Sequence, residues 1–209
     1  MVDYEELRAK VQKQAEKAWD VPAIKTWFKK LTEEGIPKKR LNREEIVASK
    51  GKILEQVQRR GEECEFMSHS CAKGAALPVM EEFGLGNMEI IKALSPFPGI
   101  GLTGRTCGAV SGGLVALGLY FGSDELINDQ ANHAAMAAAR KFLKRFEEEM
   151  GAIQCEDVEA LVFGRYLNPW VNGEAFRQAK GFEKCSLVAG TGARLAAEII
   201  IESMEEDTG

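Results

Sequence analysis

A chain of 209 residues is long enough for one sizeable domain with a buried core. Hydrophobic residues make up 45% of it and charged residues 28%, a balance that excludes disordered and fibrous proteins. The formal net charge of -5 argues against a general attraction to the phosphates of nucleic acid, so we expect no nucleic-acid partner.

The first sixty residues have the pattern of amphipathic helices. The polar beginning lacks the basic and apolar regions of an export signal, which predicts a cytoplasmic protein. Apolar residues then recur at helical spacing, and Trp19, Trp27 and Phe28 stand on the apolar stripes. We interpret residues 1–62 as a helical arm that covers the core or joins subunits. A second copy of the chain is the simplest partner for such stripes, so we expect a homodimer.

The remainder, residues 63–209, is expected to form an all-α, bundle-like domain that contains all five cysteines. Helices are predicted over residues 68–83, 87–94, 105–121 and 124–150, with shorter ones after Cys155 and a last one over 185–204. The segment over 105–121 is apolar and carries small residues for close packing. Its uncharged run is too short and too rich in glycine for a good membrane span, so we expect no membrane partner.

Four cysteines give the main functional signal, because each falls within about a turn of a predicted helix start. They are Cys71, Cys107, Cys155 and Cys185. Free N–H groups and the positive end of the helix dipole lower the pKa of a thiol, which favours metal ligation and thiol redox chemistry. Arg105, two residues before Cys107, is predicted to act in the same direction. In a reducing compartment such cysteines are metal-binding, catalytic or simply buried.

The spacing of these cysteines leaves the kind of site open. No Cys-x-x-Cys pair occurs, which excludes a zinc ribbon or a bacterial-ferredoxin run, so any site must be assembled from separate helices. The alternative is that the cysteines are small buried apolar side chains. Cys64 is interpreted as a structural thiol rather than a ligand.

Four stretches of sequence together carry a resemblance. They read His-Ser-Cys-Ala-Lys-Gly-Ala-Ala over 69–76, Thr-Cys-Gly-Ala-Val-Ser-Gly-Gly-Leu over 106–114, Gly-Ala-Ile-Gln-Cys over 151–155 and Lys-Cys-Ser-Leu-Val over 184–188. The set resembles the redox-active protein family named for its C-GCAxxG-C-C pattern, which also supplies a domain in split-Soret cytochromes. The resemblance covers roughly Glu63 to Met204. It implies an all-helical redox domain in which Cys71, Cys107, Cys155 and Cys185 act as a set, with an iron–sulfur cluster as cofactor. The chain has no Cys-x-x-Cys-His, so covalent haem is not expected.

The loop before Cys107 matches a dinucleotide fingerprint, with glycines at Gly99, Gly101 and Gly104. A Rossmann turn must follow a buried strand, and the preceding segment, which contains two prolines, cannot form one, so NAD or flavin binding is not expected. We predict instead that Gly101 and Gly104, with Gly108, let the backbone approach the cofactor at the cysteine site, where N–H groups would bind sulfur.

Other polar and aromatic residues allow two interpretations each. His69, two residues before Cys71, is either an alternative ligand or proton donor, or an ordinary capping residue. The loop with Tyr166, Asn168 and Trp170 either lines a pocket for a small organic substrate or packs around a proline turn.

The leading hypothesis is therefore an iron–sulfur protein with four cysteine ligands that moves electrons or serves a reductase. The second is a thiol–disulfide oxidoreductase in which Cys107, beside Arg105, attacks and another cysteine resolves. The third is a structural helical protein with zinc or no metal. The redox partner, whether a protein or a small molecule, is not identifiable from the sequence.

Overall fold

The computed structural model describes residues 2–206, and within that range every regular element is a helix. Its helices are α1 (Tyr4–Ala15), α2 (Val21–Glu34), α3 (Arg43–Ala48), α4 (Lys50–Ser68), α5 (Cys71–Phe83), α6 (Met88–Ala93), α7 (Gly99–Leu102), α8 (Gly108–Phe121), α9 (Asp129–Met150), α10 (Cys155–Phe163), α11 (Gly173–Gln178) and α12 (Gly181–Glu206). The all-α fold is confirmed. None of these helices is both long enough and apolar enough to cross a bilayer.

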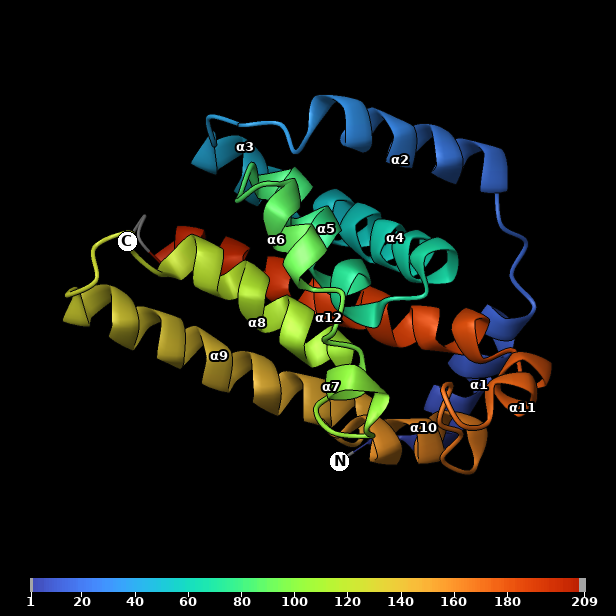
Figure 1. The fold of residues 1–209 in the computed structure, drawn as a ribbon. Helices are drawn as coiled ribbons and strands as arrows, with labels where there is room; N and C mark the ends of the chain where they lie inside the picture. Colours follow the sequence, from blue (N-terminus) through green and yellow to red (C-terminus); the bar gives the residue numbers. More distant parts are fainter. Residues whose placement is uncertain (1, 207–209) are drawn as a thin grey trace.

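Helix α12 is the central element of the bundle (Figure 1). It packs against α4 and α5 on one side and against α8 and α9 on another. Residues on every side of α12 are buried between Ser186 and Met204, as its apolar composition requires. The four cysteines stand at or near the beginnings of helices that belong to this bundle or lie at its end.

Glycines let the central helices approach one another backbone to backbone. A Cβ on Gly61 of α4 would lie 2.9 Å from the Cα of Gly190 on α12 and 3.0 Å from the carbonyl oxygen of Gly74 on α5. On α8, a Cβ on Gly112 would overlap the carbonyl oxygen of Ala72. Because no side chain separates these backbones, the first turns of α5 and α8 are held close together.

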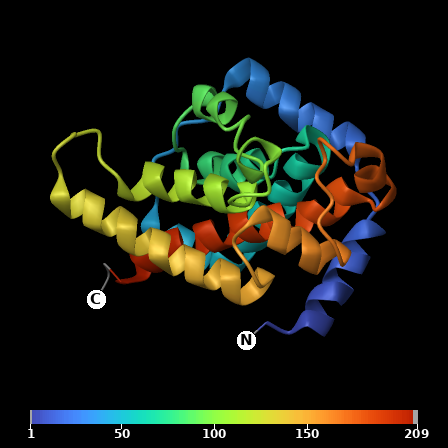
Figure 2. The ribbon, with the colours of Figure 1, turned by 60° about the horizontal axis from the view of Figure 1, so that its bottom comes forward.

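The expected N-terminal arm is built into the same core. Helices α1 and α2 lie on the outside of the bundle in both views (Figures 1 and 2). Trp19 stacks on Phe66 with ring centroids 4.4 Å apart, and Trp27, 7% exposed, donates a 2.9 Å hydrogen bond to Glu81. Phe28 packs beside them. These stripes, from which we expected a homodimer, are thus covered within the chain, and the boundary expected at residue 62 falls inside the single helix α4.

Four helix starts differ from the sequence prediction. Helix α5 begins at Cys71 rather than at 68, and α9 begins at Asp129 rather than at 124. Helix α8 begins at Gly108 rather than near 105, because the segment before it pairs with the segment before α10. The Cys107 amide donates to the Ile153 carbonyl at 2.9 Å, and the Cys155 amide donates to the Arg105 carbonyl at 2.7 Å. The last helix begins at Gly181, so that Cys185 is its fifth residue. Such pairing between distant segments leaves no local trace in sequence.

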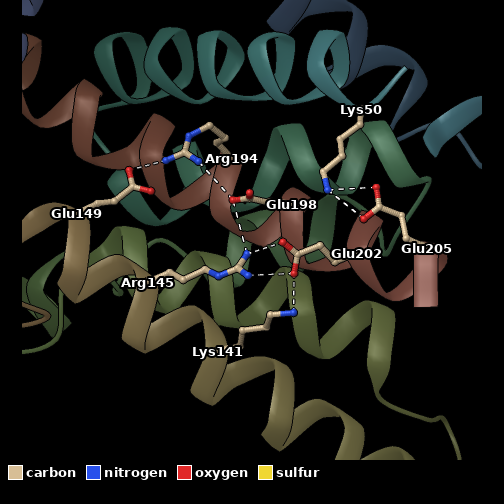
Figure 3. Close-up of polar contacts among 8 residues, drawn as sticks. All are labelled: Lys50, Lys141, Arg145, Glu149, Arg194, Glu198, Glu202 and Glu205. Atoms are coloured by element: carbon tan, nitrogen blue, oxygen red, sulfur yellow. Dashed lines mark hydrogen bonds and ion pairs between the residues drawn. The ribbon is translucent and has the colours of Figure 1, made fainter. Parts of the chain in front are cut away.

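Ion pairs join α9 to α12 on the side of the bundle away from α2 (Figure 3). Arg145 of α9 donates to both carboxylate oxygens of Glu202 on α12, at 2.8 and 3.0 Å, and its side chain is 28% exposed. Lys141 binds the same carboxylate, and Arg194 joins α12 back to Glu149. This bidentate geometry in a partly buried setting is the kind that contributes measurable stability.

We expect Arg145→Met to lower the free energy of unfolding by about 1 to 2 kcal/mol, because it leaves Glu202 with one cation in a half-buried position. Lys144→Met on the same helix is the matched control. Its 3.8 Å pair with Glu148 is largely exposed, so its loss should change stability very little. Urea denaturation of both variants measures the difference. Equal losses would contradict a special role for the Arg145 contact.

Candidate functional site

One cavity of about 280 Å³ is bordered by all four cysteines that the sequence singled out. Cys71 is the first residue of α5, Cys107 caps the start of α8, Cys155 is the first residue of α10, and Cys185 lies in the second turn of α12. The remaining lining is mostly apolar and consists of Pro98, Leu102, Val158, Pro169, Phe176, Phe182 and Val188, together with Glu65, His69, Gly99 and Glu159. Thiols that are remote in sequence thus meet around one space at the end of the bundle.

Cys71 and Cys107 interact directly at the site. The Cys71 thiol hydrogen-bonds to the Cys107 sulfur, and this bond, with the backbone amides of Ala109 and Val110, lowers the pKa of Cys107. The same bond, together with burial, raises the pKa of Cys71 well above its usual value. A Cβ on Gly108 would overlap the Cys71 sulfur. Gly108 therefore permits this approach, and Cys107 is the member of the pair that ionises first.

The pKa values of the other two thiols are raised. Burial is the main cause that raises the pKa of both Cys155 and Cys185, and nearby acidic groups add to it. The Cys155 thiol donates to the Glu159 carboxylate at 3.7 Å. The sequence suggested that helix starts would lower the pKa of all four cysteines. That holds for Cys107 alone. At Cys155 and Cys185 loss of water outweighs the helix dipole, and at Cys71 the hydrogen bond to Cys107, followed by burial, does so.

Two carboxyl groups at the cavity were missed by sequence reasoning. Glu159 accepts a 3.0 Å hydrogen bond from the Leu167 amide, and burial raises its pKa to about 7. Glu65 reaches the cavity from α4 and is 3% exposed. Glu159 had a usable signal, since it follows Cys155 by one helical turn and so shares its face. Glu65 had none, because only the packing of α4 on α5 and α12 brings it to the thiols.

The glycine loop forms one wall of the cavity, through Gly99 rather than through Gly101 or Gly104. A Cβ on Gly99 would lie 3.2 Å from the Cys155 sulfur, whereas Gly104 faces Tyr166 and Glu156, and Gly101 faces open space. The Gly101 amide donates to a carbonyl within the loop, at 2.7 Å, so it is not available to sulfur.

Backbone strain marks the same loop. Ile100 and Leu102 have φ angles of 49° and 59°, a left-handed conformation that is costly for a β-branched residue such as isoleucine. Asn168 holds the loop by donating to the Leu102 carbonyl at 2.7 Å. Strain that is retained beside four thiols fits a functional requirement for this wall.

Comparison with known proteins identifies a family whose match includes the four cysteines that border the cavity. The model of a family described as "Putative redox-active protein (C_GCAxxG_C_C)" matches residues 69–199, which is more than half of the chain and includes all four cavity cysteines. The chain belongs to the C_GCAxxG_C_C family. No curated protein and no solved structure gives a match. The family name makes redox activity the general function, and the match begins four residues after Glu65.

The remaining residues singled out by sequence lie at the edge of the C_GCAxxG_C_C site or outside it. Arg105 is exposed and its side chain does not line the cavity. Cys64 is buried outside the cavity, where loss of water raises its pKa to about 12 and leaves it an inert thiol. His69 lines the cavity and caps the C-terminal end of α4 in a left-handed conformation. Its ring stacks on that of Phe182, with ring centroids 3.8 Å apart. Burial lowers the pKa of His69, which favours its neutral form.

A second hollow of about 610 Å³ adjoins the thiol cavity and shares His69, Pro98 and Leu102 with it. Trp170, 83% exposed, and Asn168 border this hollow, while Tyr166 hydrogen-bonds to the Asn168 side chain at 3.0 Å. The aromatic loop is therefore placed at the approach to the family cysteines.

No three side chains of His, Cys, Asp or Glu within residues 2–206 stand close enough to hold a single metal ion. The thiols border a shared space instead of converging on one point. In an iron–sulfur cluster the thiolates bind different irons, one thiolate per iron in a 4Fe–4S cluster and two per iron in a 2Fe–2S cluster, so the sulfurs stand around the cluster. A set of four thiols around a largely apolar cavity fits such a group.

Proposed function

We propose that this protein is an electron-transfer protein, or the electron-carrying part of a reductase, that holds an iron–sulfur cluster through Cys71, Cys107, Cys155 and Cys185. The observation that carries the proposal is that these four family cysteines border one cavity while coming from four helices. A bound cluster would supply one-electron redox chemistry.

The protein's own contribution is to hold the thiols in place and to control their environment. The apolar lining, with Phe176 and Phe182, keeps bulk water away from the site. Neutral thiols must lose their protons when iron binds, so cluster assembly should release protons. Cys107, whose pKa is lowered, is the sulfur best prepared to bind first.

Anaerobic purification followed by iron and acid-labile sulfide analysis tests the proposal. We expect a coloured protein in which iron and sulfide are bound in whole-number amounts per chain. Colourless, iron-free protein from iron-supplemented cells, with all five thiols free, would refute the cluster. Zinc in place of iron would instead support a structural metal site.

A thiol–disulfide oxidoreductase is the second candidate, and the Cys71–Cys107 contact favours it. The Cys107 thiolate would attack the disulfide of a partner and release one partner thiol. Cys71 would then attack the mixed disulfide, which leaves a Cys71–Cys107 disulfide and a fully reduced partner. In the purification experiment this function would give colourless protein that loses two free thiols reversibly on oxidation.

A further inference from the structure

Glu65 is a buried acid without a counter-charge. Its side chain is 3% exposed, and its Oε2 atom makes no hydrogen bond. No lysine, arginine or histidine in the described part of the chain forms an ion pair with it. A buried charge is normally paired or bound to a metal, so an orphaned carboxyl oxygen in a core calls for an explanation.

The other acids buried nearby have partners. Glu62, one turn earlier on α4, pairs with Lys17 and accepts a 3.2 Å hydrogen bond from Gln58. Glu159 accepts hydrogen bonds from the Leu167 amide and the Cys155 thiol. Glu65 therefore differs from acids of the same type and similar burial in the same molecule.

The backbone around Glu65 leaves its side chain little choice of direction. Gly61 and Gly74 bring α4 against α5, and a Cβ on Gly74 would lie 3.3 Å from the Cβ of Glu65. The carboxyl group borders the same cavity as all four family cysteines. The fold thus holds a hard oxygen donor at a fixed place beside four soft sulfur donors.

The electrostatics of the cavity point the same way. Burial raises the pKa of Glu65 well above its usual value, and the Cys107 thiolate adds to the rise. Glu65 in turn contributes to the raised pKa of Cys71, Cys155 and Cys185. One acid thus interacts with all four thiols, and a positively charged iron centre in the cavity would favour the ionised form of each group.

We propose that the Glu65 carboxylate is an oxygen ligand of the same metal centre, where it binds one iron as an additional, fifth ligand beside the four thiolates of the site. This inference rests on the proposed function. Glu65 lies before the part of the chain that the family model matches. An additional anionic ligand stabilises the more oxidised metal, so its removal should shift the midpoint potential in the positive direction.

The test compares Glu65→Leu and Glu65→Gln with wild type, both without metal and loaded with iron and sulfide. Metal-free Glu65→Leu should be more stable to urea than wild type, since it removes an unpaired buried carboxyl group. The loaded variants should show altered electron paramagnetic resonance and Mössbauer spectra and a more positive potential. They should also lose iron to a chelator roughly tenfold faster or more.

Glu62→Gln is the matched control. It removes a buried acid that has a cation partner, so it should destabilise the metal-free protein and leave the iron spectra unchanged. Iron-bearing Glu65→Leu with wild-type spectra and potential would refute the ligand role and leave the cluster standing. A metal-free Glu65→Leu protein that is clearly less stable would also refute it. Wild-type protein that assembles no cluster would refute both proposals.

Discussion

Replacing any one of Cys71, Cys107, Cys155 and Cys185 by serine is expected to remove most of the bound iron. A serine hydroxyl is neutral at pH 7 and is a poor ligand for iron, so one iron of the cluster would lose a protein ligand. We expect iron and sulfide per chain to fall by about tenfold or more, with loss of the visible absorption. Elemental analysis and absorption spectra of anaerobically prepared protein measure this.

Cys64→Ser is the matched control for these four variants. Cys64, at 1% exposure, is more deeply buried than the four cavity cysteines, but it does not border the cavity. Its sulfur lies 3.8 Å from the Ser68 hydroxyl oxygen. Its replacement should leave the iron content at the wild-type level, although it costs some stability. Iron retained in any of the four cavity variants, in proteins that circular dichroism shows to be folded, would contradict the four-thiolate site.

Replacing Gly112 by alanine should have the largest effect on the fold. The new Cβ would overlap the carbonyl oxygen of Ala72, a backbone atom that cannot move without displacing the first turn of α5. Overpacking against backbone belongs at the upper end of the usual range, so we expect a loss of about 3 kcal/mol or more. That corresponds to a fall in Tm of about 6 to 12 °C for a chain of this size. Thermal unfolding followed by circular dichroism measures it.

Gly118→Ala, on the same helix, should have the opposite sign. A Cβ at this exposed position meets nothing within 4 Å, and alanine favours the helix over glycine by about 0.5 to 1 kcal/mol. A pair of variants that changed stability in the same direction would argue against close packing of α5 and α8. Because Ala72 follows Cys71 directly, Gly112→Ala should also reduce iron binding, whereas Gly118→Ala should not.

Helical periodicity in the N-terminal region predicted the helices correctly, but it did not predict the surface against which their apolar faces pack. The stripe with Trp19 and Trp27 shows that these residues are buried, and a pattern of this kind does not distinguish the chain's own core from a second subunit. In the structure Trp19 and Trp27 contact Phe66 and Glu81 of the same chain, while the homodimer stays a prediction. An apolar stripe predicts that a helix face is buried, but it does not predict which surface covers that face.

Thiol chemistry was predicted only in part, for a related reason. The N-terminal ends of helices were visible in the sequence, and with them the field that favours a thiolate. The depth of burial was not visible, and it raises the pKa of Cys155 and Cys185 against that field. The donor to Cys107 is another cysteine, Cys71, rather than the nearby Arg105, which is exposed.

By itself the sequence determined that the protein is helical, which cysteines form a set and that the set belongs to a redox family. It could do so because these properties follow from local periodicity and from short motifs. Tertiary structure alone decided that the four sulfurs border one cavity and that Gly99, Glu159 and Glu65 stand beside them. It did so because contacts among α4, α5, α8, α10 and α12 depend on glycine-permitted distances between segments far apart in the chain. Glycines in the sequence show that a close approach is possible, but not which segment approaches.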